Sequence, residues 1–164
     1  MKILVLSDSH SGLRFMPLAI DRVKPDAVIH LGDYYDDGEA MAEMYRHIPF
    51  HQVPGNRDQY GIYAIRRETL CYNVCGVKLF MTHGHNHRVN YGLNMLLRDA
   101  RAAGAAAALY GHTHVADCHM EEDGIWVLNP GASGKISGSV GLIETDGNRI
   151  ITCTILPITE FVTA

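Results

Sequence analysis

The stretch Gly-His-Thr-His at residues 111–114 places two imidazoles one residue apart, directly after an apolar run at residues 105–110. Side chains at positions i and i+2 of an extended segment point to the same face, so His112 and His114 can reach one object. A shared metal centre is such an object, and the alternative is a surface loop that holds two unrelated histidines. The choice depends on whether other metal-binding side chains are placed to join them.

Four further segments carry metal-binding side chains directly after a predicted strand. The segments are SDSH, GDYYDD, PGNRD and THGH, and they contribute Asp8, His10, Asp33, Asn56 and His83. Taken singly, each has another explanation, as a helix cap, a turn or a hydrogen-bonded histidine at a strand end. Ligands of open α/β sheets bind at the carboxyl ends of the strands. Because five predicted strands end in donor groups, we expect these side chains to meet at one edge of the fold.

The seven donors are carboxylate, amide and imidazole groups, with no thiolate among them. This mixture suits Mn²⁺, Fe or Zn²⁺ in a reactive site better than a structural zinc. Seven donors are too many for one tetrahedral ion. They suit two ions about 3.5–4 Å apart that share one carboxylate, an arrangement used in phosphoryl transfer. We expect two divalent ions, with Mn²⁺ first and Fe, Zn²⁺ or Ni²⁺ as alternatives.

The first third of the chain alternates strands and helices. Apolar runs ending in polar residues predict buried strands at residues 2–8, 26–33 and 49–56. Helices are predicted at residues 15–24, ending before Pro25, and at residues 38–48. This alternation predicts parallel pairing with right-handed crossovers.

The pattern changes after residue 66. Residues 69–84 predict two strands joined near Asn73–Gly76, and residues 91–104 predict a helix capped by Gly104. The alanine-rich residues 105–111 follow that cap and lead into the histidine motif, so we predict a short buried strand there. Residues 115–131 and 139–156 each hold an Asp-Gly pair between β-rich runs, which predicts two hairpins.

Length and composition set limits on the protein. The 164 residues suit a single α/β domain spanning residues 1–164, and the net charge of −4 argues against binding of long nucleic acid. A small anionic substrate remains compatible, because a bound cation reverses the local field. The few cysteines, the short apolar run at the amino terminus and the lack of a membrane-length apolar segment predict a cytoplasmic protein. A zinc site at Cys71 and Cys75 is the weaker alternative to free thiols, and the oligomeric state stays open, a homodimer or larger assembly included.

The motifs D-x-H, G-D, G-N, H-G-H and G-H-x-H occur in this order from Asp8 to His114, and NPGAS follows them at residues 129–133, so that the whole set spans residues 3 to about 133. As an ordered set they resemble the calcineurin-like metallophosphoesterase superfamily, and the short chain resembles its small bacterial and archaeal phosphodiesterase branch. The resemblance implies an αββα four-layer sandwich, in which two mixed β-sheets pack face to face between helices.

The resemblance also implies roles for the motif residues. One metal ion is bound by Asp8, His10 and His114, a second by Asn56, His83 and His112, and Asp33 bridges the two. His85 is not a ligand in the family pattern, and we expect it close enough to touch substrate. His30 is expected in the core or behind the ligands.

The chain departs from the family pattern at Arg57, where family phosphatases commonly carry a histidine that protonates the leaving oxygen. Arginine stays protonated in proteins, so it can bind a phosphate oxygen but cannot donate a proton. The alternative is that Arg57 only forms an ion pair with Asp58 or Asp37. The departure weakens the monoesterase interpretation more than the family resemblance. The expected catalytic residues are Asn56, Arg57 and His85.

We therefore interpret the sequence as a dinuclear metal-dependent phosphodiesterase that hydrolyses a small phosphodiester by in-line attack of a metal-activated hydroxide. A phosphomonoesterase or phosphoprotein phosphatase with the same chemistry is the first alternative. The second is a protein-binding scaffold with weak or lost catalysis, like the retromer subunit of this superfamily.

Overall fold

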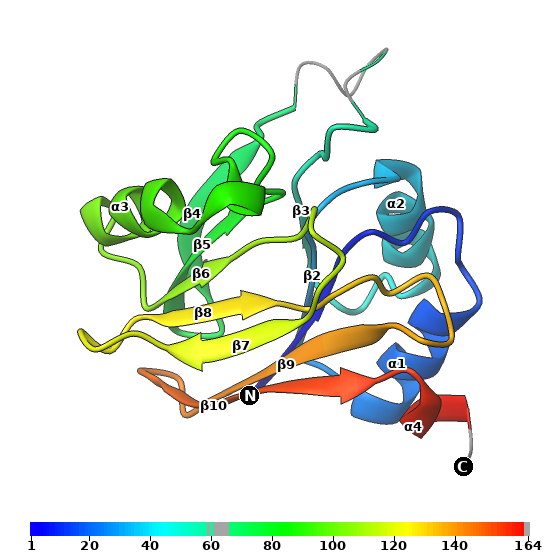
Figure 1. Cartoon of the computed structure of the whole chain (residues 1–164). Helices are drawn as coiled ribbons and strands as arrows, with labels where there is room; N and C mark the ends of the chain where they lie inside the picture. Colours follow the sequence, from blue (N-terminus) through cyan, green and yellow to red (C-terminus); the bar gives the residue numbers. More distant parts are fainter. Residues whose placement is uncertain (59, 61–65, 163–164) are drawn as a thin grey trace.

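Two five-stranded β-sheets form the centre of the computed structural model, which describes residues 1–58, 60 and 66–162 (Figure 1). The first sheet has the order β10-β9-β1-β2-β3 and the second β4-β5-β6-β8-β7. Helices α1 and α2 lie outside the first sheet and α3 outside the second. The fold is the expected αββα sandwich.

The first sheet is built from β1 (Lys2–Leu6), β2 (Ala27–His30) and β3 (Phe50–Gln52), which pair in parallel. The helices α1 (Phe15–Val23) and α2 (Tyr35–Met44) connect them. The hairpin of β9 (Ser139–Thr145) and β10 (Ile150–Pro157) adds to β1 in antiparallel orientation. A short α4 (Thr159–Val162), which the sequence did not predict, packs near α1.

The second sheet pairs β4 (Thr69–Val74) with β5 (Val77–Thr82) as a hairpin and continues in parallel through β6 (Ala107–Leu109) to β8 (Trp126–Asn129). The antiparallel strand β7 (Asp117–Met120) lies at its edge. Between β5 and β6 the chain forms a 3₁₀ turn, η2 (Val89–Tyr91), and α3 (Asn94–Ala102). Both predicted hairpins and the short alanine-rich strand are confirmed.

The continuous apolar run of β1 reflects burial on both faces of its sheet. Ile3 and Val5 pack in the core between the two sheets, whereas Leu4 and Leu6 pack against α1 on the other face, and all four are fully buried. A third cluster joins α3 to the outer face of the second sheet. The two sheets are therefore fixed relative to each other by a shared apolar layer.

The helix predicted at residues 38–48 runs instead from Tyr35 to Met44. It begins earlier because the Tyr35 backbone N–H donates to Asp58 Oδ1, 23 residues away, at 2.9 Å. Gly38 lies inside the helix, where a side chain would collide with Gln52.

All four cysteines are free, and within the described part of the chain Cys71 and Cys75 belong to no metal-binding group. None of the described helices is long and apolar enough to span a membrane.

Candidate metal centre

The loops that follow β1, β2, β3, β5 and β6 meet at one edge of the two sheets. These are the carboxyl ends of strands that run parallel within each sheet. The loops carry all seven predicted donors, namely Asp8, His10, Asp33, Asn56, His83, His112 and His114. The sheet-to-sheet core thus places donors from both sheets at the same edge.

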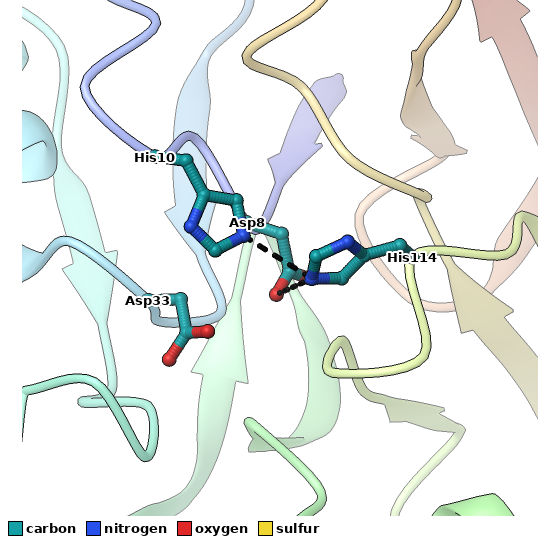
Figure 2. A group of neighbouring side chains, drawn as sticks. All are labelled: Asp8, His10, Asp33 and His114. Atoms are coloured by element: carbon teal, nitrogen blue, oxygen red, sulfur yellow. Dashed lines mark hydrogen bonds and ion pairs between the residues drawn. The ribbon is translucent and has the colours of Figure 1, made fainter.

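Asp8, His10, Asp33 and His114 form one group, in which a donor atom from each lies within 4.8 Å of the others (Figure 2). His114 Nε2 lies 3.1 Å from Asp8 Oδ1 and 3.2 Å from His10 Nε2. Apart from this contact with His114, Asp8 Oδ1 is buried and has no hydrogen-bond partner among the described residues. A buried carboxylate oxygen without a hydrogen bond is costly, and a cation would satisfy it.

Asn56, His83 and His112 form the second group. Asn56 Oδ1 lies 3.1 Å from His83 Nε2 and 3.0 Å from His112 Nδ1. His83 Nε2 also lies 3.4 Å from Asp33 Oδ1, so Asp33 contacts the second group as well as the first. Asp33 therefore occupies the position that a shared carboxylate needs.

His83 shows most clearly why a cation fits here. Its Nδ1 lies 2.8 Å from the carbonyl oxygen of Leu31, which can only accept, so Nδ1 carries the proton. Burial lowers the pKa of His83 to about 4, and the ring is neutral at pH 7. Nε2 then presents a lone pair toward the oxygens of Asn56 and Asp33. Acceptor atoms that converge without a proton between them match the chemistry of a metal site.

The electrostatics of the remaining donors agree with this interpretation. Burial lowers the pKa of both His10 and His112, which favours the neutral imidazole that a metal requires. Burial also raises the pKa of Asp8 to about 6, against the opposing hydrogen bond from Ser7 Oγ at 2.6 Å. Such desolvation disfavours the carboxylate unless a positive charge is close.

Five of the seven donors have left-handed backbone conformations, with φ between 45° and 69°: Asp8, His10, Asp33, His112 and His114. Residues other than glycine rarely adopt this region, although Asp, Asn and His do so more than most. Strained conformations cluster at functional sites, where the surrounding structure maintains them. The glycines of the motifs supply the space, because a side chain at Gly55 would collide with Asp33 and one at Gly111 with Ser7.

Several supporting residues were not identified from the sequence. Asn129 is fully buried, and its Nδ2 donates to Gly111 O and to Thr113 Oγ1, each at 3.0 Å. These bonds hold the loop that carries both motif histidines. The sequence indicates a role for the segment NPGAS, to which Asn129 belongs, only through the family resemblance. Asn90, whose Nδ2 lies 2.9 Å from His112 Nε2, carried no signal in the sequence.

A buried network supports the loop after β1. Ser9 Oγ donates to Asp37 Oδ2 at 2.7 Å and lies 3.2 Å from His30 Nε2. The same Asp37 oxygen accepts the backbone N–H of Ser11 at 2.8 Å. His30 is fully buried, as the sequence predicted.

His85 and Arg57 border the donors without joining either group. The His85 ring centroid lies 5.4 Å from that of His83 and 6.1 Å from that of His112. Arg57 is exposed, and its backbone N–H donates to Asp33 Oδ1 at 2.9 Å. Among the described residues Arg57 forms no ion pair, so the alternative partners Asp37 and Asp58 do not bind it.

A sandwich of two sheets with donor loops from both at one edge is the architecture of a metal-dependent phosphoesterase. Residues 1–148 match the calcineurin-like phosphoesterase superfamily domain, and the chain belongs to this family. A probable metallophosphoesterase of Mycoplasma pneumoniae is 33% identical over 136 residues, covering 80% of this chain and 78% of that protein.

Solved structures share the fold. A conserved predicted phosphoesterase of Streptococcus pneumoniae is 30% identical, with a TM-score of 0.74 over 96% of this chain and 89% of that chain. Vps29 of Entamoeba histolytica, solved in complex with Zn²⁺, has a TM-score of 0.72 at 20% identity and covers 97% of this chain and 100% of that chain. The family resemblance of the motifs is thereby confirmed.

Proposed function

We propose that the protein is a phosphodiesterase that uses two divalent metal ions. Asp8, His10 and His114 hold one ion, and Asn56, His83 and His112 hold the other. Asp33 bridges them. The observation that carries the proposal is the convergence of unprotonated acceptors around His83 Nε2, next to the separate group around Asp8.

When bound, such a pair of ions lowers the pKa of water toward about 7 and neutralises charge on phosphoryl oxygens. The residues of this chain supply position and charge. Asp33 fixes the spacing of the two groups through its contacts with both. Asn56 and the exposed Arg57 orient the phosphoryl oxygens, and His85 borders the substrate on the side of His83 and His112.

A diester is favoured over a monoester because Arg57 cannot protonate a leaving oxygen. A monoanionic diester with an acidic leaving group depends less on such a proton. Mn²⁺ is the proposed metal, and Fe, Ni²⁺ or Zn²⁺ is the alternative. The Zn²⁺ complex of the Entamoeba histolytica Vps29 supports the last of these. We also propose a cytoplasmic location, a single domain and a small soluble substrate.

The test is hydrolysis of bis(p-nitrophenyl) phosphate and p-nitrophenyl phosphate by purified protein with added Mn²⁺. We expect metal-dependent turnover of the diester in excess of the monoester, and loss of that turnover in Asp33→Ala. A preference for the monoester would establish the phosphomonoesterase alternative.

The likeness in fold to Vps29 proteins favours a second candidate function, a scaffold that binds other proteins. All seven donors are present here in a converging arrangement, which a scaffold without catalysis does not require. Absence of turnover with every one of the four metals would favour the scaffold.

A further inference from the structure

A pocket of about 530 Å³ opens beside the proposed metal ligand Asn56, which lines it. Its lining consists of Tyr34, Asp36, Asn56, Arg57, Asp58 and Tyr60. The volume falls within the range of about 300–1,000 Å³ that small-molecule sites occupy. We call it the Tyr34 pocket. A phosphodiester has two ester groups, so a substrate held at the donor groups projects one of them toward a neighbouring pocket.

Tyr34 is held in position by the backbone around it. It directly follows Asp33, precedes the first residue of α2, and has a left-handed conformation with φ of 69°. This conformation is unfavourable for a bulky side chain and persists only where the fold imposes it. The Tyr34 ring lies edge-on to His10, with centroids 5.3 Å apart. The ring is thus fixed between the pocket and a proposed metal ligand.

The aromatic surface of the pocket is open to solvent. Tyr34 is 40% exposed and Tyr60 is 83% exposed. Aromatic rings that face a pocket and lack full packing can stack on a planar ligand group, and such stacking tolerates many ring types.

In the described part of the chain, one cation and two carboxylates line the pocket, namely Arg57, Asp36 and Asp58. Both carboxylate oxygens of Asp58 accept backbone N–H groups, one from Tyr35 at 2.9 Å and one from Gly55 at 2.8 Å. Asp58 therefore stabilises the backbone around it. Arg57 is the one cation that lines the pocket among the described residues, and it follows the proposed ligand Asn56. A guanidinium binds phosphate oxygens and also stacks on aromatic faces.

We propose that the Tyr34 pocket binds a planar aromatic ester group of the substrate, a nucleobase or an aryl ring, stacked on Tyr34 while Arg57 contacts the adjoining phosphate. This inference rests on the proposed phosphodiesterase function and adds the chemical class of its substrate.

The kinetic test keeps the leaving group constant. The p-nitrophenyl diesters of thymidine 5′-phosphate, phenyl phosphate and methyl phosphate are compared by kcat/KM with Mn²⁺. We expect the aromatic esters to exceed the methyl ester by at least about fivefold, the lower end of base–aromatic stacking. The thymidine and phenyl arms distinguish a nucleobase site from an aryl site. In Tyr34→Leu the ratio of kcat/KM for the aromatic esters to kcat/KM for the methyl ester is expected to fall near one. Tyr34→Phe is expected to preserve this ratio.

The matched control is Tyr72→Leu. Tyr72 is 37% exposed, lies on β4 and does not line the pocket. It is expected to leave the ratio unchanged. A wild-type ratio near one, or an unchanged ratio in Tyr34→Leu, would overturn the inference while diester hydrolysis itself still stands.

A binding measurement separates this inference from the proposed function. Calorimetry on Zn²⁺-loaded protein compares thymidine 5′-phosphate with ribose 5-phosphate, which lacks the base. Tighter binding of the nucleotide by at least about fivefold in wild type and Tyr72→Leu, but not in Tyr34→Leu, supports the pocket. Equal binding of the two ligands by wild type rejects it. If no diester is hydrolysed, the proposed function fails and calorimetry still decides the pocket.

Discussion

Asp33 is the residue that contacts both donor groups. A carboxylate oxygen of Asp33 lies within 4.8 Å of donor atoms of Asp8, His10 and His114. Its Oδ1 lies 3.4 Å from His83 Nε2 in the second group. We expect Asp33→Ala to lower kcat/KM for a diester by more than about 100-fold, because even residues behind metal ligands contribute about 10- to 100-fold. His85→Ala, the comparison variant, is expected to lose less. Near wild-type turnover of Asp33→Ala with two metal ions bound would contradict the bridging role.

We expect Arg57, which cannot donate a proton, to make the reaction depend strongly on the leaving group. Without a general acid, typically worth about 10²–10⁴-fold, rates should fall steeply as the leaving-group pKa rises. We expect this steep dependence for wild type on a series of aryl diesters, and a shallower one for Arg57→His. A flat dependence in wild type, unchanged by the substitution, would show that another residue donates the proton.

We expect buried His30 to make the metal-free protein less stable in acid. Burial lowers its pKa from the ordinary 6.5 to about 4, and its Nδ1 has no hydrogen-bond partner among the described residues. As pH falls from 6.5 toward 4, the His30 imidazole becomes protonated in the unfolded chain but stays neutral in the native state. The free energy of unfolding therefore decreases, by up to about 1.4 kcal/mol per pH unit.

Urea unfolding of wild type and His30→Gln at pH 7.5, 6 and 5 measures this contribution. We expect a flatter pH dependence in the variant. Buried His83 contributes to the pH dependence of unfolding with the same sign in wild type and variant, so its contribution cancels when the two proteins are compared. Identical slopes would mean that His30 binds its proton over the same pH range in the native and the unfolded state.

At the scale of elements, the end of β8 holds the histidine loop in place through Asn129, the last residue of the strand. Asn129→Ala removes two donated hydrogen bonds and the one accepted from Gly131 at 2.9 Å. Since buried unpaired groups cost about 1–3 kcal/mol each, we expect the free energy of unfolding to fall by about 2–4 kcal/mol. Metal affinity should fall by about 10- to 100-fold. Thermal unfolding and metal titration measure the two effects.

The matched control is Asn148→Ala, in the exposed turn between β9 and β10. Its expected change in the free energy of unfolding is below about 0.5 kcal/mol. If Asn129→Ala weakens metal binding no more than this control does, the end of β8 does not position the loop.

The elements that could be predicted are those with local signals. Apolar runs located the strands, and Asp-Gly pairs located both hairpins. The start of α2 could not be predicted, because Asp58 caps it from 23 residues away. The donors were predicted from their positions at strand ends. Their supports, Asn90 and the Ser9–Asp37 bond, depend on contacts between distant segments that no local pattern encodes.

At the scale of the whole molecule, metal binding should couple the two sheets. The donors come from loops of both sheets, so an ion bound only to the native state stabilises their relative placement. At a free metal concentration of 100 times Kd, one site adds about 2.7 kcal/mol. A chain of this size then gains about 5–11 °C in Tm.

Calorimetry with and without Mn²⁺, together with elemental analysis approaching two ions per chain, tests this expectation. His114→Ala serves as the comparison and should bind fewer ions. Saturation near zero, or an unchanged Tm at saturating metal, would contradict a metal centre between the sheets.

The left-handed conformations of five donors also limit how the protein can evolve. The codons of Asp, Asn and His share their second and third bases and differ only in the first. A single nucleotide change can therefore exchange one donor type for another among the residues that best tolerate this backbone. Most other single changes install residues that the loop conformation disfavours. Natural variation at these positions should therefore concentrate on exchanges among Asp, Asn and His, and metal preference can shift while the loops stay intact.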